Sequence, residues 1–271
     1  MLLPITAHCL LFTLMRVDWS KKVVFITGAS SGIGRALAVE LGKRGASLGL
    51  LARRADVLRE IVAEVEAAGG RALALPADVR DAAAVGSAAE ELRKAFGAID
   101  VLVANAGVGA LTAATDLKPE VVADVININV IGAVNSAAAV LPAMVERNEG
   151  QLVVISSLAA YRGLPKSAAY SASKAAISAF FESLRVDLHQ TNVDVTIIHP
   201  GFIKTPLTSG REAKMPYLME LDDAIEKIVR AIENRKKSYA FPWQLASIVR
   251  ASMLMPVPLY DRIMSKRSYR E

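Results

Sequence analysis

Tyr170 and Lys174 stand four residues apart in the segment Y-S-A-S-K, and Ser157 precedes the tyrosine by 13 residues (170 − 157). On a helix, residues i and i+4 project from one face, so the Lys174 ammonium can lie near the Tyr170 phenol. A nearby cation favours the phenolate and lowers the pKa of a tyrosine from its usual value of about 10. Ser157 can donate a hydrogen bond to a substrate oxygen. We therefore expect a proton-transfer site in which Tyr170 exchanges a proton with a substrate held by Ser157.

A glycine-rich turn near the N-terminus has the pattern of a phosphate-binding loop. Residues 22–26 form an apolar, strand-like run, the turn 27–34 reads T-G-A-S-S-G-I-G, and a helical pattern follows over 35–44. Glycines permit a tight turn, and the N-terminus of the following helix offers backbone N–H groups to a pyrophosphate. The spacing is G-x-x-x-G-x-G rather than the commoner G-x-G-x-x-G. The residues expected to contact a dinucleotide here are Gly28, Ser30, Ser31, Gly32, Ile33 and Gly34.

Apolar runs typical of buried strands alternate with helical patterns along most of the chain. The strand-like runs cover residues 23–26, 47–52, 72–76, 101–104, 152–156 and 193–199. The helical patterns cover residues 36–44, 57–68, 82–96, 119–147, 168–189 and 223–234. This alternation predicts an α/β fold with a single Rossmann-like, doubly wound parallel β-sheet and helices on both faces. Ligands bind at the carboxyl ends of the strands in such sheets, and the motifs above fall at those ends.

Composition narrows the classes of partner. With 271 residues, 53% of them hydrophobic, the chain can bury a large core, and we expect one catalytic domain over 21–239. The net charge of +5 comes without a long basic run, so nucleic acid is not an expected partner. Cys9 is the only cysteine, which favours a reducing, cytoplasmic location. His8, His189 and His199 are scattered, so no metal site is expected.

Five motifs in this order resemble the classical short-chain dehydrogenases/reductases over about residues 21–239: T-G-A-S-S-G-I-G, then N-A-G at 105–107, Ser157, Tyr170 and Lys174. The resemblance implies an oxidoreductase that transfers a hydride between a nicotinamide and a carbonyl or secondary alcohol of an apolar small molecule. Tyr170 would be the general acid/base, with Ser157, Lys174 and Asn129 completing the catalytic set. Asn129 matches the family's N-V-x-G spacing and would hold a water that links Lys174 to solvent, whereas Asn127 is the competing residue by type.

The resemblance also implies further cofactor contacts. Asp78 and Val79 fall where the family contacts the adenine ring, although Asp78 also reads as the N-cap of a helix. The remaining expected contacts border the cofactor and the nicotinamide carboxamide, and they are Asn105, Ala106, Gly107, Pro200, Gly201, Ile203 and Thr205.

Two arginines decide the expected cofactor. Ala52 stands where NAD-preferring relatives carry aspartate, and Arg53 and Arg54 follow it, so we predict NADP(H) through pairing with the 2′-phosphate, with NAD(H) less favoured. The alternative is that both arginines form a solvated turn. A second function also stays open, a non-catalytic module that senses NADP(H) and acts through a protein partner. The intact Ser-Tyr-Lys set argues against it, because a sensor needs no proton donor.

Terminal segments flank the predicted domain. Residues 1–20 are expected to be peripheral, because the apolar stretch 2–15 is shorter than the ~20 residues that span a bilayer, and Met15 is an alternative start. Residues 240–271 form an amphipathic extension with basic residues beside apolar ones. Three roles stay open for it: weak contact with an anionic membrane surface, a cap over the substrate pocket, or packing across a dimer.

Substrate recognition is expected in the segment 206–221. Its apolar side chains would form an adaptable lid, and they are Leu207, Met215, Pro216, Tyr217, Leu218 and Met219. The alternative is a surface loop partly buried by a neighbouring subunit. The family resemblance implies a homodimer or homotetramer built from long helices such as 119–147 and 168–189.

Overall fold

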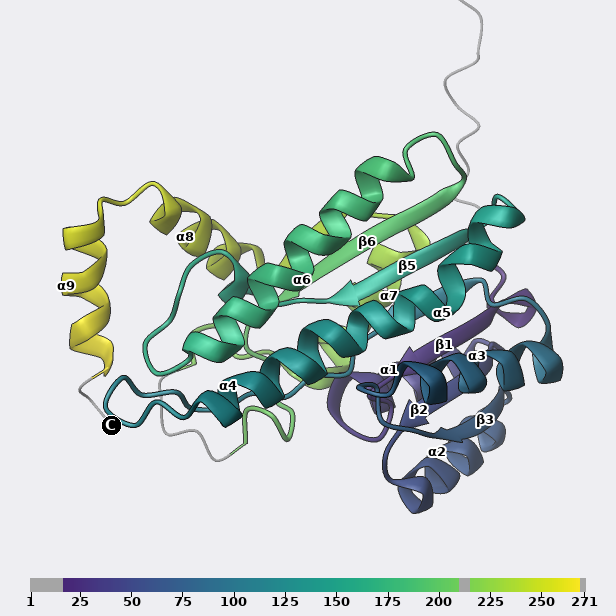
Figure 1. Ribbon diagram of the computed structural model, residues 1–271. Coiled ribbons are helices and arrows are strands. Elements are labelled where there is room, and N and C mark those ends of the chain that lie inside the picture. The colour runs from purple at the N-terminus through teal and green to yellow at the C-terminus, as the bar shows by residue number, and fades with distance from the viewer. Residues whose placement is uncertain (1–16, 210–214, 269–271) are drawn as a thin grey trace, which may run out of the picture.

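A computed structural model describes residues 17–209 and 215–268 of the chain, so the expectations for residues 1–16, Met15 included, lie outside the described residues. The centre of the molecule is a sheet of seven parallel strands in the order β3-β2-β1-β4-β5-β6-β7 (Figure 1). The strands are β1 (Val23–Thr27), β2 (Ser47–Ala52), β3 (Arg71–Pro76), β4 (Val101–Ala104), β5 (Gly150–Ile155), β6 (Val193–Pro200) and β7 (Ser238–Phe241). The predicted α/β fold and its parallel sheet are confirmed.

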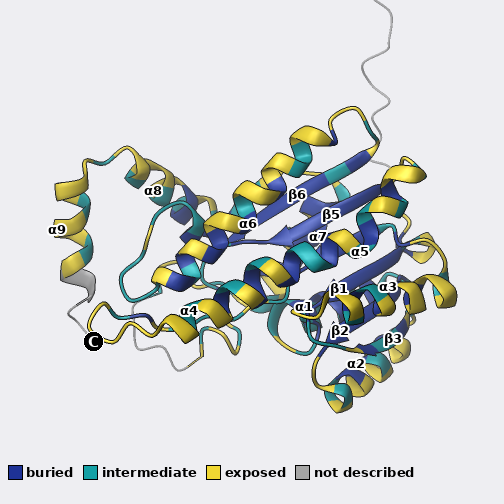
Figure 2. Ribbon diagram, viewed as in Figure 1, coloured by how far each residue is buried: buried dark blue, intermediate teal, exposed yellow. Residues whose placement is uncertain are grey.

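Helices cover both faces of this sheet. Helices α1, α2 and α7 lie on one face, and α3, α5 and α6 lie on the other. The helices of the described residues are α1 (Gly32–Lys43), α2 (Ala55–Ala67), α3 (Ala82–Phe96), α4 (Pro119–Ile126), α5 (Gly132–Glu146), α6 (Ala168–Asp187), α7 (Leu221–Glu233), α8 (Trp243–Met253) and α9 (Val257–Ser268). In the part of the chain that the structure describes, three short helical turns complete the elements, η1 (Trp19–Lys21), η2 (Asn127–Ile131) and η3 (Leu158–Ala160). The inner strands are buried along their whole length (Figure 2), which explains why they read as continuous apolar runs.

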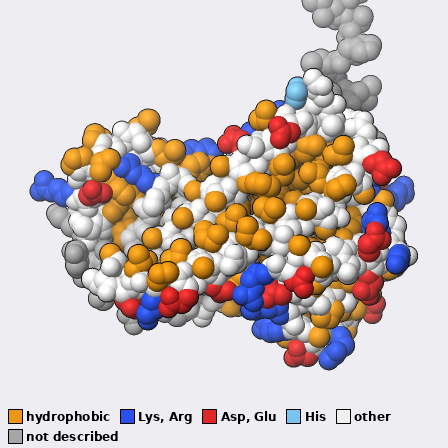
Figure 3. All heavy atoms as spheres, viewed as in Figure 1, with side chains coloured by type: hydrophobic (Ala, Val, Ile, Leu, Met, Phe, Trp, Pro, Cys, Tyr) orange, Lys and Arg blue, Asp and Glu red, His pale blue; other side chains and the backbone are white. Residues whose placement is uncertain are grey.

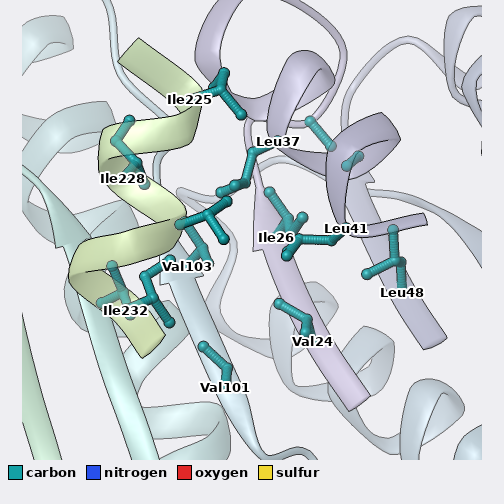
Figure 4. Close-up of a cluster of buried hydrophobic side chains, with 14 of the residues drawn as sticks. Val24, Ile26, Leu37, Leu41, Leu48, Val101, Val103, Ile225, Ile228 and Ile232 are labelled. Carbon is teal, nitrogen blue, oxygen red and sulfur yellow. The ribbon is translucent and has the colours of Figure 1, made fainter. Parts of the chain in front are cut away.

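Two hydrophobic clusters lie on opposite faces of the sheet. Helices α1, α2 and α7 enclose one of them, in which Leu37 of α1 and Ile228 of α7 meet Ile26 of β1 and Val103 of β4 (Figure 4). Helices α3, α5 and α6 enclose the other, where Phe181 of α6 is fully buried. Packing on both faces fixes the strand register and therefore the positions of the loops at the carboxyl ends of the strands.

The helix expected over 119–147 is interrupted. Helix α4 passes into the π-helical turn η2 and then into α5, and the Gly132 N–H donates to the Asn127 carbonyl five residues before it. A π-turn inserts one extra residue into the helical repeat, so it changes the direction in which Asn129 projects. By length and composition, Pro119–Glu146 could cross a membrane, with a mean hydropathy of 1.7. Helix α5 packs on β4 and β5, as a core helix of an α/β fold does. Such core helices can have the same length and hydropathy as a membrane-spanning helix.

The sheet extends beyond the boundary expected at residue 239. Strand β7 pairs in parallel with β6 up to the pair Pro200 and Phe241, and Phe241 is 2% exposed in the core. The predicted boundary therefore falls inside a strand, because a four-residue strand carries too short a pattern to recognise. Helices α8 and α9 follow β7 and lie beyond the carboxyl ends of the strands (Figure 1).

Candidate active site

The turn between β1 and α1 is a compact cradle. Gly28 has a φ of +66°, and a Cβ there would lie 2.6 Å from the Ala106 Cα; a Cβ on Gly34 would lie 2.4 Å from the Gly28 carbonyl oxygen. Both positions therefore require glycine. Helix α1 begins at Gly32, and the Ser31 side chain makes no capping hydrogen bond. The first-turn N–H groups of α1 and its positive dipole end are thus available to an anion in the cavity that Ser31, Gly32 and Ile33 line.

Asn105 joins the ends of β1 and β4, where the strand order reverses. Its Nδ2 donates to the carbonyl oxygens of Thr27 at 3.0 Å and Gly28 at 3.1 Å. Thr27 Oγ1 accepts from the backbone N–H groups of Asn105 at 3.2 Å and Ala106 at 3.3 Å. Asn105 thus fixes the cradle against the neighbouring strand. The positioning role of Thr27 was missed in the sequence, where it appears only as the first residue of the glycine motif.

Ser157, Tyr170 and Lys174 line one cavity with the cradle. Tyr170 and Lys174 lie in the first turns of α6, and the Lys174 Nζ is 5.7 Å from the centre of the Tyr170 ring. The Nζ also donates to the Ile155 carbonyl at 2.8 Å. Lys174 is 5% exposed, and this burial lowers the pKa of its ammonium to about 8. The Ser157 Oγ, just beyond β5, accepts from the Ala159 N–H at 3.1 Å.

Asn129 is buried in the π-turn and uses its amide on protein partners. Its Oδ1 accepts from the Val108 N–H at 2.8 Å, and its Nδ2 donates to the Val108 carbonyl at 2.9 Å and the Ser173 Oγ at 2.9 Å. The side chain therefore braces the loop after β4 against α6. A Cβ on Gly107 would lie 3.3 Å from Asn129 Oδ1 and 3.5 Å from Lys174 Nζ, so a glycine is what lets this loop pass so close to both. Water binding at Asn129 stays a prediction.

The expected adenosine-binding residues gather at the other end of the cavity. Arg54 Nη2 donates to the Ser30 carbonyl and to Ser30 Oγ, both at 3.0 Å, so it ties the start of α2 to the cradle. The Arg80 guanidinium, 2.7 Å from Asp78, holds the pKa of that carboxyl below its usual range, with a smaller contribution from Arg53. The side chain that caps α3 is Asp81, which accepts from the N–H groups of two residues in its first turn. The N-cap interpretation of Asp78 is therefore wrong.

All of the expected cofactor contacts except Gly34 line this cavity, whose volume is about 1830 Å³. Gly34 instead packs beneath the cradle, and Asn129 lies behind Lys174. In the expected lid, Leu207 and Pro216 line the cavity, Met219 packs on the core, and Tyr217 and Leu218 are exposed to solvent. Residues 210–214 of that segment lie outside the described residues.

Helices α8 and α9 complete the cavity wall. Arg162, in the loop after Ser157, donates to the carbonyl oxygens of Ser252 and, at 3.1 Å, Met255. Its guanidinium carbon lies 3.8 Å from the centre of the Tyr260 ring, and the Tyr260 hydroxyl donates to the Gly163 carbonyl at 2.5 Å. The described part of the extension lines the cavity, as expected for a cap over the pocket, whereas contact with a membrane surface and packing across a dimer stay predictions. No local sequence signal marked Arg162, because its partners lie about ninety residues away along the chain.

Within the described ranges, no group of three or more His, Cys, Asp or Glu side chains is arranged to hold a metal ion.

Comparison with known proteins agrees with this geometry. Residues 22–216 match the family model described as short chain dehydrogenase. The chain is 46% identical over 244 residues to an uncharacterized oxidoreductase of Myxococcus xanthus, covering 90% of this chain and 96% of that protein.

Solved structures of similar fold hold nicotinamide cofactors. A short-chain dehydrogenase/reductase from Burkholderia phymatum in complex with NAD has a TM-score of 0.79 and 27% identity, covering 86% of this chain and 93% of that one. An alcohol dehydrogenase from the archaeon Thermococcus sibiricus, complexed with 5-hydroxy-NADP, has a TM-score of 0.74 and 27% identity, covering 81% and 95%. The chain belongs to the short-chain dehydrogenase/reductase family and is an oxidoreductase that uses a nicotinamide cofactor.

Proposed function

We propose that the protein is an NADP(H)-dependent reductase of an apolar ketone. The observation that carries this proposal is the single cavity shared by the glycine cradle and by Ser157, Tyr170 and Lys174. The residues of the cradle fit a dinucleotide, because glycines stand where a Cβ would collide with backbone and the N-terminus of α1 offers donors to a pyrophosphate.

Each side chain has one task in this mechanism. When bound, the reduced nicotinamide supplies the hydride to the carbonyl carbon. Ser157 donates a hydrogen bond to the carbonyl oxygen and so orients the substrate. Tyr170 donates its phenolic proton to the same oxygen as negative charge develops there, which leaves the alcohol and a phenolate. The Lys174 ammonium, anchored on the Ile155 carbonyl, stabilises that phenolate.

Substitution of Tyr170 by phenylalanine tests the proposal. We expect Tyr170→Phe to lower kcat for ketone reduction by about 10²–10⁴-fold, because the ring remains and the proton donor is lost. NADPH binding, followed by fluorescence titration, should be unchanged. Tyr217→Phe, which changes an exposed tyrosine, is the matched control. Near-native reduction by Tyr170→Phe would remove Tyr170 from the role of general acid.

The choice of NADP(H) rests on the absence of an acidic side chain at Ala52 and on the two arginines beside it. Arg53 and Arg54 both line the cavity, and the exposed Arg53 acts electrostatically on Asp78 across it. A 2′-phosphate at this end of the cavity would meet two cations. The two solved relatives bind an NAD and a modified NADP, so family membership alone leaves the preference open.

Homo-oligomerisation through the α4, α5 and α6 surface is also proposed. Apolar side chains gather on this face (Figure 3), and Ile131, Val145 and Val186 are 43%, 41% and 59% exposed on it. A contiguous apolar surface on long helices is typical of a face covered by a second subunit.

A further inference from the structure

The substrate half of the cavity has an apolar wall that runs away from the reacting groups. The wall begins beside Ser157 with Leu158, which packs against Leu245 of α8 in a small buried cluster. It continues along α8 with Ile248 and Val249, and it reaches α9. In Figure 1, α9 is the element farthest from the sheet on this side, so the wall extends outward from the ends of the strands.

Apolar side chains also form the rim of this cavity. Ile248, Leu259 and Ile263 line the cavity and are 54%, 48% and 37% exposed, and Leu111 and Leu207 line it at 72% and 41% exposed. Exposed apolar surface on a concave wall is removed from water when an apolar ligand lies against it, and this removal favours binding. A small, compact ketone held at Ser157 would leave the rim in water.

The size of the cavity agrees with a long ligand beside the cofactor. Its volume of about 1830 Å³ exceeds the roughly 300–1,000 Å³ of a pocket for one drug-sized ligand. Three cationic side chains, Arg162, Lys166 and Arg262, also line this half. The Arg162 guanidinium is held by the carbonyl oxygens of Ser252 and Met255 and by the Tyr260 ring. Between Leu158 and the rim, the wall along α8 is apolar because Leu245, Ile248 and Val249 line it.

On the basis of the proposed function, we propose that the substrate is a ketone with an extended apolar tail. The carbonyl group lies at Ser157 and Tyr170, and the tail runs along α8 to the rim formed by Ile248 and Leu259. The two helices thus set the specificity of the site for chain length, whereas the groups on β5 and α6 carry out the reduction.

A homologous series of straight-chain 2-ketones, from butanone to dodecanone, tests this assignment with NADPH as the reductant. We expect kcat/KM to rise by up to about fourfold per added methylene until the tail reaches the rim. In Ile248→Asn, the ratio of kcat/KM for dodecanone to kcat/KM for butanone should fall at least tenfold relative to wild type. Trp243→Ala is the matched control on α8, because this exposed tryptophan stands outside the cavity lining.

The outcomes separate this inference from the proposed function. The proposal of an apolar tail is overturned if kcat/KM is independent of chain length, or if it rises equally with chain length in wild type and Ile248→Asn. Either result leaves the proposed reductase activity standing. If no ketone turns over, the proposed function fails, and the inference is decided by titrating the same ketones calorimetrically into protein saturated with NADP⁺. An affinity that rises with chain length and falls in Ile248→Asn supports the wall, whereas equal or absent binding of all the ketones overturns it.

Discussion

The Lys174 ammonium is buried beside the proton donor Tyr170, and this burial removes it from water. Its ammonium lies near the Tyr170 ring and is anchored by the Ile155 carbonyl, while burial alone lowers its pKa to about 8. At pH 7 most of the lysine therefore stays protonated, which is the state that stabilises a phenolate. Above pH 8 the ammonium is progressively lost, so its support for the Tyr170 phenolate weakens in alkaline solution.

The same pKa shift predicts a pH dependence of stability. Between about pH 8 and 10.5 the unfolded chain holds the Lys174 proton more tightly than the folded chain, so the contribution of Lys174 to stability rises with pH. We expect the difference in unfolding free energy between wild type and Lys174→Met to shift by roughly 2 kcal/mol in favour of wild type between pH 7.5 and 9.5. Urea denaturation at both pH values measures it. Lys236→Met, at an exposed lysine, is the control, and a constant difference for Lys174→Met would contradict the shift.

Arg53 carries the prediction on cofactor choice. Wild type should prefer NADPH over NADH by at least tenfold in kcat/KM, which corresponds to about 1.4 kcal/mol. Arg53→Ala should reduce kcat/KM for NADPH and leave that for NADH nearly unchanged, because only the 2′-phosphate loses a partner. Arg59→Ala, on the exposed side of α2, serves as the control in the same steady-state assay. A tenfold preference of wild type for NADH would overturn the assignment of NADP(H).

At the scale of elements, one arginine fixes α8 and α9 to the loop that follows Ser157. Arg162 reaches the carbonyl oxygens at the end of α8 and the Tyr260 ring of α9, and Tyr260 returns a hydrogen bond to Gly163. Helix α9 is otherwise exposed over much of its surface. Its position therefore depends on a few polar contacts rather than on a buried core.

Removal of this clamp should loosen the wall without disturbing the sheet. We expect Arg162→Ala to lose about 1–3 kcal/mol of stabilisation of α8 and α9, because charged hydrogen bonds and a cation–π contact are removed. Hydrogen exchange should accelerate in these two helices and stay unchanged in β1 and β4. Arg230→Ala, which breaks only a surface pair with Glu226 on α7, is the control. Unchanged exchange in α8 and α9 would show that Arg162 does not hold them.

Several elements could be predicted from the sequence because the patterns that indicate them involve neighbouring residues. The glycine turn, the buried strands and the Tyr170–Lys174 spacing each depend on residues close together in the chain, so type and position were both readable. The π-turn was not predicted, because one extra residue scarcely alters the apolar pattern of α4 and α5. The N-cap alternative for Asp78 was wrong because a second aspartate, Asp81, stands closer to the first turn of α3 and caps it. The Arg162 clamp joins distant segments, which no local pattern reveals.

At the scale of the whole molecule, the apolar face of α4, α5 and α6 leads to a prediction about assembly. Light scattering coupled to size-exclusion chromatography should give a mass that is twice or four times the 28.9 kDa of one chain. Val186→Glu, which places a charge on this face, should shift the protein toward smaller species, because a buried charge opposes association. Val257→Glu, at an exposed site on α9, is the control. A monomer at micromolar concentration would exclude the proposed assembly.

The order of the segments along the chain separates the two halves of the cavity. Most of the residues expected to contact the nucleotide lie between Gly28 and Gly107, whereas the apolar wall comes largely from α8 and α9, which follow the final strand. Sequence changes at the cavity-lining residues of these two helices alter the apolar wall and leave the glycine turn in place. Proteins descended from one ancestral gene can therefore come to act on different substrates while they keep the same nicotinamide cofactor.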